Sequence, residues 1–131
     1  MRKSNQKGFT IIELLVVIVI IGILVALALP NLFAAQARGR DSDRKNELKN
    51  LQQKLESYFN DNDQYPAAAT WAADIGASAD ETTGPRSDTY TYATPDQQTY
   101  TLTATLENAG DKDTSDGTGP LADYVLVSVN Q

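Results

Sequence analysis

The chain divides into an apolar first part and a polar remainder. Residues from Phe9 to Leu29 are almost all apolar and include a single charged residue, Glu13. As a helix rising ~1.5 Å per residue, this stretch is roughly 31 Å long, which is enough to cross the hydrocarbon core of a bilayer. A secretory signal peptide has a shorter apolar core, usually ~7 to 15 residues, followed by a small-residue cleavage site. The pattern therefore predicts a transmembrane helix over residues 9–29.

A helical pattern continues from Pro30 to about Asn60. Its apolar positions form one stripe, which predicts packing against a sheet: Leu48, Leu51, Leu55, Tyr58 and Phe59. Residues 38–47, which read RGRDSDRKNE, are polar all round and contain an Asp41–Lys45 pair at a favourable helical spacing. We interpret this run as a solvated neck in preference to a set of ion pairs between subunits.

Three strand signals follow the helical part. The runs 89–94, 99–106 and 124–129 are rich in Thr, Tyr, Val and Leu, and the second alternates Tyr100, Leu102, Ala104 and Leu106 with threonine. Trp71 lies in the loop before them and is interpreted as a core anchor. The predicted fold is α+β: a long N-terminal helix, transmembrane in its first half and amphipathic in its second, packs on a small three-stranded antiparallel sheet.

Composition excludes several kinds of chemistry. The chain has no His and no Cys, which removes the commonest general base, the usual zinc ligands and any disulfide. Without a nucleophile and base in a recognisable arrangement, we do not expect an enzyme. Between residues 60 and 131 only Arg86 and Lys112 are basic, against twelve acidic residues. Such a surface repels phosphates, so we expect no nucleic-acid binding by this part of the chain.

Charges around the apolar run suggest its orientation. Arg2, Lys3 and Lys7 precede the run and favour a cytoplasmic N-terminus.

The Glu13 carboxylate lies inside the run, where a charge costs ~2.5 to 3.5 kcal/mol at the helix centre and less near an interface. Solvation at the nearby interface is one interpretation of Glu13. Neutralisation by a cation is the favoured one.

Residues 7–32 read KGFTIIELLVVIVIIGILVALALPNL. This string resembles the leader and first helix of type IV pilins and of type II secretion pseudopilins. The resemblance implies cleavage by a prepilin peptidase between Gly8 and Phe9, N-methylation of Phe9, and pairing of its amine with Glu13 of a neighbouring subunit. It also implies assembly roles for Gly22 and Pro30, although transmembrane helices tolerate Gly and Pro for other reasons.

The resemblance also implies how the chain is divided. The segments are a cleaved cytoplasmic leader (1–8), a transmembrane assembly helix (9–29), an amphipathic helix (30–63) and a globular head (64–131). The implied function is that of a structural filament subunit in a type IV pilus or a type II secretion pseudopilus, and the choice between the two stays open. The alternative is a single-pass membrane-anchored extracytoplasmic binding protein with an uncleaved signal anchor.

The same resemblance implies partners and a location. The partners are identical subunits, related minor pilins, the prepilin peptidase, the inner-membrane assembly platform and membrane lipid. The location is the bacterial cytoplasmic (inner) membrane, with the head extracytoplasmic. Once in the filament, the subunit would be periplasmic or extracellular.

Residues 107–123 form an acidic loop between the last two predicted strands. The loop carries oxygen ligands of the kind that calcium prefers: Asp111, Asp113, Ser115, Asp116 and Asp123. It is not an EF-hand, because Asp116 and Ala122 stand where that motif needs Gly and Glu. The resemblance to major pseudopilins implies a calcium site in a comparable loop. A solvated acidic turn is an equally supported interpretation.

Overall fold

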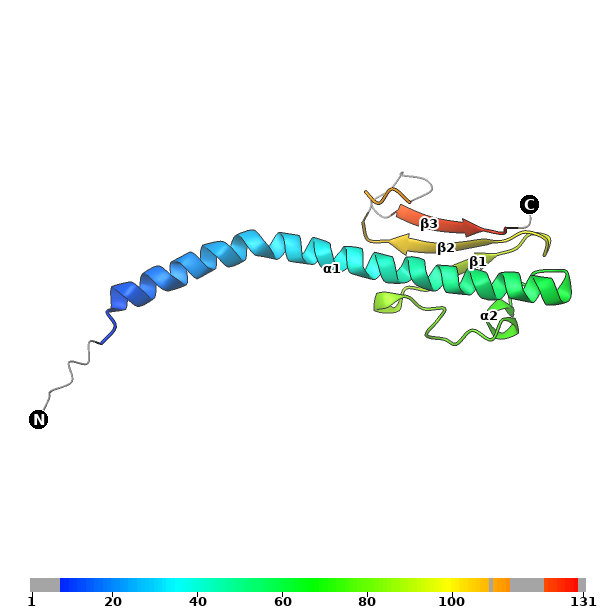
Figure 1. The fold of residues 1–131 in the computed structure, drawn as a ribbon, viewed down its shortest axis with the longest axis horizontal. Coiled ribbons are helices and arrows are strands. Elements are labelled where there is room, and N and C mark those ends of the chain that lie inside the picture. Colours follow the sequence, from blue (N-terminus) through cyan, green and yellow to red (C-terminus); the bar gives the residue numbers. More distant parts are fainter. Residues whose placement is uncertain (1–7, 109, 114–121, 130–131) are drawn as a thin grey trace, which may run out of the picture. The chain divides into compact units, whose positions relative to one another are not determined.

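The structure is a computed structural model that describes residues 8–108, 110–113 and 122–129 (Figure 1). Its helices are α1 (Ile11–Asn62), α2 (Trp71–Asp74) and the 3₁₀ helix η1 (Pro85–Ser87), and its strands are β1 (Thr91–Ala93), β2 (Thr101–Leu106) and β3 (Ala122–Val127). The strands form one antiparallel sheet in the order β1-β2-β3. This arrangement confirms the predicted α+β fold.

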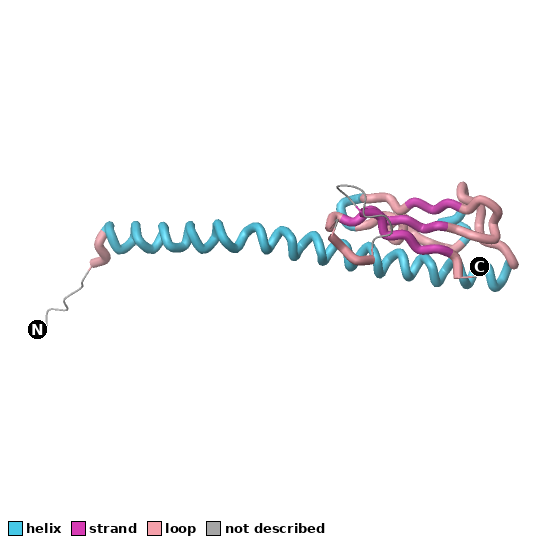
Figure 2. The backbone as a smooth tube through the Cα atoms, turned by 90° about the horizontal axis from the view of Figure 1, so that it is seen from above, coloured by secondary structure: helices cyan, strands magenta, loops and turns pink. Residues whose placement is uncertain are grey.

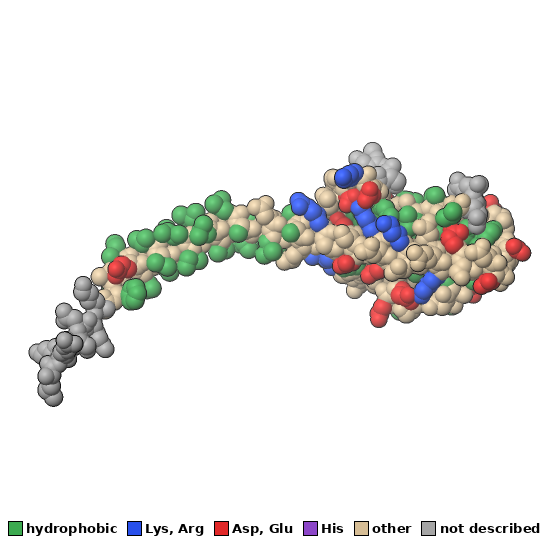
Figure 3. Space-filling view, viewed as in Figure 1, with side chains coloured by type: hydrophobic (Ala, Val, Ile, Leu, Met, Phe, Trp, Pro, Cys, Tyr) green, Lys and Arg blue, Asp and Glu red, His purple; other side chains and the backbone are tan. Residues whose placement is uncertain are grey.

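The chain forms two compact units that divide between Ala35 and Gln36. In the first unit, α1 begins at Ile11 and is helical through Pro30. Every residue from Gly8 to Ala35 is exposed, and hydrophobic side chains cover this part of the helix in Figure 3. Among the described helices, α1 alone has the length and apolar composition needed to cross a membrane. The first unit therefore has an apolar surface but no core of its own.

The second unit, residues 36–131, is built on the second half of α1 and is wider than the predicted head of 64–131; from here on we call this whole unit the head. The strands lie along this half of the helix, as Figures 1 and 2 show. The α1 stripe of Leu48, Leu51 and Leu55 is buried, and Phe59 packs against the same core. In β2 the buried and exposed residues alternate, as the sequence predicts. The sheet and its flanks contribute the rest of the core: Tyr90, Tyr92, Tyr100, Leu102, Ala104, Leu106 and Tyr124.

The strand boundaries differ from the predicted ones for identifiable reasons. β1 is shorter than 89–94 because Thr89 forms a bridge with Thr83, and the Tyr90 amide donates to the Thr82 carbonyl. β3 ends at Val127, before the predicted end at Val129, where the Val129 amide donates to the Glu56 carboxylate. Contacts outside the sheet therefore replace the expected strand pairing.

Trp71 lies against the core, as predicted. Its ring stacks on Tyr92 at a centroid distance of 5.0 Å. Tyr92 in turn contacts Tyr100, and Tyr100 contacts Tyr65, with centroid distances of 5.8 and 4.7 Å. Aromatic packing therefore joins the loop that carries α2 to the sheet.

The interpretation of residues 38–47 as a solvated neck is wrong for part of the run. Asp41 and Arg44 are each only 1% exposed and form an ion pair of 2.8 Å. The Asp41 carboxylate also accepts hydrogen bonds from the backbone amides of Glu107 and Asn108, both at 2.9 Å. The expected Asp41–Lys45 pair is replaced, since Asp41 bonds to Arg44. Burial of this pair anchors the chain that follows β2 on α1.

Gly84 occupies a position where a side chain has no room. A Cβ atom there would lie 2.6 Å from the hydroxyl of Tyr90, which donates to the Glu47 carboxylate on α1. We expect Gly84→Ala to lower the free energy of unfolding by about 1–3 kcal/mol, because the tyrosine must move. Gly39→Ala is the matched control, since it meets nothing within 4 Å and favours the helix. Chemical denaturation followed by fluorescence checks both, and equal stability of the two variants would contradict the packing described here.

Candidate functional site

The start of α1 is closed by a reciprocal pair of hydrogen bonds between Thr10 and Glu13. The Glu13 amide donates to the Thr10 hydroxyl at 3.3 Å, and the Thr10 amide donates to the Glu13 carboxylate at 2.9 Å. The Thr10 hydroxyl also donates to the same carboxylate oxygen at 2.7 Å. This arrangement is a capping box, which satisfies backbone amides that a helix start leaves without partners. Glu13 therefore has neutral partners within its own chain.

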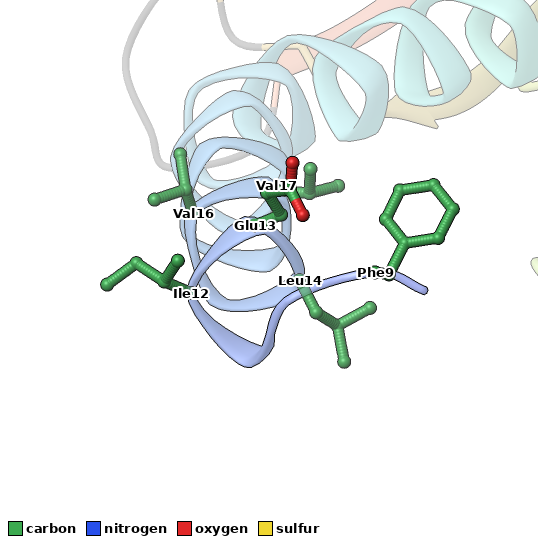
Figure 4. A pocket seen from close by; sticks show the side chains of 6 residues that line it. All are labelled: Phe9, Ile12, Glu13, Leu14, Val16 and Val17. Carbon is green, nitrogen blue, oxygen red and sulfur yellow. The ribbon is translucent and has the colours of Figure 1, made fainter. Parts of the chain in front are cut away.

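Apolar side chains surround this carboxylate. A surface groove at the start of α1 is lined by Glu13 and five apolar residues: Phe9, Ile12, Leu14, Val16 and Val17. Figure 4 shows Glu13 as the only charged side chain among the six. In the described part of the chain every ion pair lies in the head, so no basic side chain there neutralises Glu13. The site thus combines a carboxylate with an apolar, exposed surface.

The structure brings together some of the predicted site residues and separates others. Gly8 and Phe9 are exposed and precede α1, close in sequence to Glu13. Gly22 and Pro30 lie further along the helix, which is continuous through both. A side chain at Gly22 would meet nothing within 4 Å. The implied roles of these residues in cleavage, methylation and assembly stay predictions.

A second cluster of charges lies in the head around Glu107, the residue that follows β2. The Arg40 guanidinium donates to both carboxylate oxygens of Glu107, at 2.8 and 2.6 Å, and Arg44 donates to one of them at 3.0 Å. Arg44 also donates to the Pro85 carbonyl at 3.2 Å and pairs with Asp88. Two arginines of α1 thus connect the end of β2 with the segment around η1. Charge-assisted, bidentate contacts of this kind are among the stronger hydrogen bonds in proteins.

The acidic residues proposed as calcium ligands are only partly within the described chain. Asp111 and Asp113 each pair with the Lys45 ammonium group, at 2.6 and 2.8 Å. The Asp123 carboxylate accepts a hydrogen bond from the Thr105 hydroxyl at 3.0 Å. Ser115 and Asp116 lie outside the described residues. Among the residues that are described, no three His, Cys, Asp or Glu side chains come together as a metal site would require. A calcium site therefore stays a prediction.

Sequence reasoning missed Thr10, Asp41, Arg44 and Lys45. A Thr three residues before a Glu, directly ahead of an apolar run, is the sequence signature of a capping box and was available for Thr10 and Glu13. Asp41 and Arg44 continue the spacing of the buried stripe of Leu48, Leu51 and Leu55. For Lys45 the local helical spacing indicated Asp41 as the partner, whereas its actual partners, Asp111 and Asp113, are distant in sequence.

The charge cluster in the head predicts acid sensitivity. Hydrogen bonds from Arg40, and then from Arg44, lower the pKa of Glu107 from an ordinary value of 4.5 to about 2. Because the unfolded chain takes up this proton first as the pH falls, the stabilisation is complete above about pH 4.5 and is lost on the way to pH 2.

We expect Glu107→Gln to lower the free energy of unfolding by on the order of 1–2 kcal/mol at pH 6 and by less at pH 3. Denaturant titrations at the two pH values check this. Asp61→Asn is the control, since Asp61 is exposed and its side chain has no hydrogen bond or ion pair with the described residues. A pH-independent effect of Glu107→Gln would contradict the assignment.

Comparison with known proteins gives two family matches. Residues 3–29 match the model of the prokaryotic N-terminal methylation motif. Residues 34–118, more than half of the chain, match the model described as type IV minor pilin ComP, DNA uptake sequence receptor. No solved structure matches the chain.

Curated relatives come from both of the filament systems that the sequence resembles. The type IV major pilin protein PilA of Myxococcus xanthus is 43% identical over 72 residues, which are 55% of this chain and 31% of the relative. The type II secretion system core protein G of Aeromonas hydrophila is 39% identical over 66 residues, 50% of this chain and 46% of the relative. The type IV wide pilus major component PilA4 of Thermus thermophilus is 48% identical over 61 residues, 47% of each.

The matched region spans less than half the length of each of these three relatives. The two family models nevertheless cover both the apolar start of α1 and most of the head. Together with the α+β fold, they show that the chain belongs to the family of type IV pilins and type II secretion pseudopilins.

Proposed function

We propose that this chain is a structural subunit of a type IV pilus-like or type II secretion pseudopilus filament. A prepilin peptidase cuts between Gly8 and Phe9, the new amine of Phe9 is methylated, and residues 9–29 then drive polymerisation. The observation that carries this proposal is the start of α1, where the Glu13 carboxylate lies in an apolar surface that is exposed throughout. Membership of the pilin family supports it.

The apolar half of α1 needs a cover that the described residues do not provide. Removing apolar surface from water is favourable by about 25 cal/mol per Å², so a helix that is apolar on all sides is stable only in lipid or among other helices. Lipid covers the subunit before assembly, and copies of the same helix cover it afterwards. The cytoplasmic membrane therefore acts as the reservoir from which subunits are drawn, with the head on the extracytoplasmic side.

The charge of Glu13 makes packing among neighbouring helices more favourable than remaining in lipid. Its hydrogen bonds to Thr10 satisfy the oxygen atom that they reach but leave the negative charge uncompensated. Cleavage before Phe9 creates an amine, and pairing of that amine with Glu13 of a neighbouring copy would neutralise both charges. A buried charge is tolerable when it is paired, so docking in the correct register is favoured over other registers.

The other proposed partners follow from this assembly route. They are identical subunits, related minor pilins, the peptidase and the inner-membrane assembly platform. Relatives of both the pilus and the secretion type support the filament class without choosing between the two machines. We assign no catalytic reaction to the chain.

The family model that matches the head is described as a DNA uptake sequence receptor. We do not extend DNA binding to this chain, because Arg86 and Lys112 are the only basic residues after residue 60 and twelve acidic residues accompany them. Such a charge balance opposes binding to a phosphate backbone. Retention of duplex DNA by the full chain at low salt would contradict this assignment.

Two substitutions at Glu13 separate its charge from its role in the capping box. Glu13→Leu removes both, whereas Glu13→Gln removes the charge but keeps an acceptor that can close a capping box. We expect both variants to insert into the membrane normally and both to reduce filament yield at least ~10-fold, the effect of losing about 1.4 kcal/mol per contact.

Sheared filament fractions and electron microscopy measure the yield, and membrane fractions measure insertion. Thr10→Val is the matched control, since it weakens the cap and leaves the carboxylate charged. Normal filaments from Glu13→Gln would show that Glu13 serves the helix cap alone, and the assembly role proposed here would then be withdrawn.

A further inference from the structure

We infer that the ammonium group of Lys45, in place of a divalent metal ion, is the cation that holds Asp111 and Asp113 on α1, so that the head folds without calcium. The inference concerns the head alone and is independent of the proposed filament role. It follows from the position of Lys45 and from the way the described members of the predicted calcium-ligand set, Asp111, Asp113 and Asp123, are distributed.

Lys45 lies at the centre of a cluster drawn from three parts of the head. Its Nζ atom lies 2.6 Å from Asp111 Oδ1 and 2.8 Å from Asp113 Oδ2, and 5.5 Å from the ring centroid of Tyr124 in β3. The Lys45 side chain is only 14% exposed, and Tyr124 is buried. An ammonium group that is held by two carboxylates over an aromatic face is a well-satisfied cation.

This geometry leaves little room for calcium at the same carboxylates. Calcium takes six to eight oxygen ligands at roughly 2.3–2.6 Å. An ion that bound the lysine-facing oxygens of Asp111 and Asp113 would lie within a few ångströms of the Lys45 ammonium, where two positive charges repel each other strongly. The Asp111 oxygen that faces Lys45 also accepts the Asp113 amide at 3.0 Å. The carboxylates of Asp111 and Asp113 therefore already accept hydrogen bonds from donors within the head.

The remaining described ligand of the predicted set points elsewhere. Asp123 and Tyr124 are successive residues of β3, so their side chains lie on opposite faces of the sheet. Tyr124 belongs to the buried core beside Lys45, whereas Asp123 pairs across the strands with Thr105 on the outer face. The described acidic residues are thus divided between the two faces.

Lys45 is the second of two α1 side chains that hold the segment after β2 on the helix. Asp41 holds the backbone amides of Glu107 and Asn108, and Lys45, one turn further along α1, holds Asp111 and Asp113. The described segment after β2 is therefore fixed to the helix at both ends by side chains of the chain itself. Within the described residues, these contacts hold the segment on α1 without a metal ion.

The test uses the full chain in detergent micelles, with thermal unfolding followed by tryptophan fluorescence. Trp71 is the only tryptophan, so the signal reports on the head. We expect the same Tm for the wild type in excess calcium and in chelator at matched ionic strength. Lys45→Met should lower the Tm by roughly 4–8 °C, the shift expected for about 1 kcal/mol in a domain of this size. Lys49→Met is the matched control, because Lys49 is exposed and has no side-chain partner among the described residues, and its Tm should not change.

A second comparison reveals the sign of the interaction. Asp113→Asn should lower the Tm of the wild type, because it removes a partner of Lys45. In the Lys45→Met background the same substitution should leave the Tm unchanged or raise it, because it then relieves repulsion between two carboxylates. A wild-type Tm that rises with calcium would overturn the inference, and that measurement does not depend on any variant folding. Equal Tm values for Lys45→Met and Lys49→Met would overturn it as well.

Discussion

The start of α1 presents an apolar surface that no other described residue covers, and this constraint determines what the chain can do. All residues from Gly8 to Ala35 are exposed, and the stretch includes one carboxylate, that of Glu13. Water is an unfavourable environment for the apolar side chains. Lipid suits these side chains but leaves the Glu13 charge without a counter-ion. Only an environment that is apolar and also supplies a cation satisfies both, and neighbouring copies with a free amine at Phe9 would provide it.

The second half of the same helix organises the head, which is small and has neither disulfides nor a large core. Asp41 and Arg44 are buried, and burial of two charges is costly unless further hydrogen bonds satisfy them. Here the Asp41 carboxylate accepts two backbone amides as well as Arg44. Together with Lys45, these charges hold segments that follow β2 against the helix. The head is therefore held together by polar contacts in addition to its apolar core.

Sequence reasoning succeeded where a local period reports directly on burial. Leu48, Leu51 and Leu55 are buried at helical spacing, and β2 alternates as expected, so the fold class was predictable. It failed for Asp41 and Arg44 because polar composition suggested exposure, whereas their burial is set by Glu107 and Asn108, more than sixty residues away. Gly8 and Phe9 were found through a family resemblance, whereas Glu13 was already marked as the one charge within the apolar run. The acidic residues after β2 were also identified, but the sequence could not show that Lys45 lies between two of them.

The most direct test of the filament account is the N-terminus of the chain as it occurs in sheared filaments. The filaments are assembled from the full-length gene product, and the mass of their N-terminal peptide is measured. This one experiment shows whether the incorporated subunits are cleaved and whether they are modified. The account predicts a peptide that begins with N-methylated Phe9. Recovery of filaments whose subunits retain Met1 would contradict it, because an uncleaved chain has no amine at Phe9 with which to neutralise Glu13.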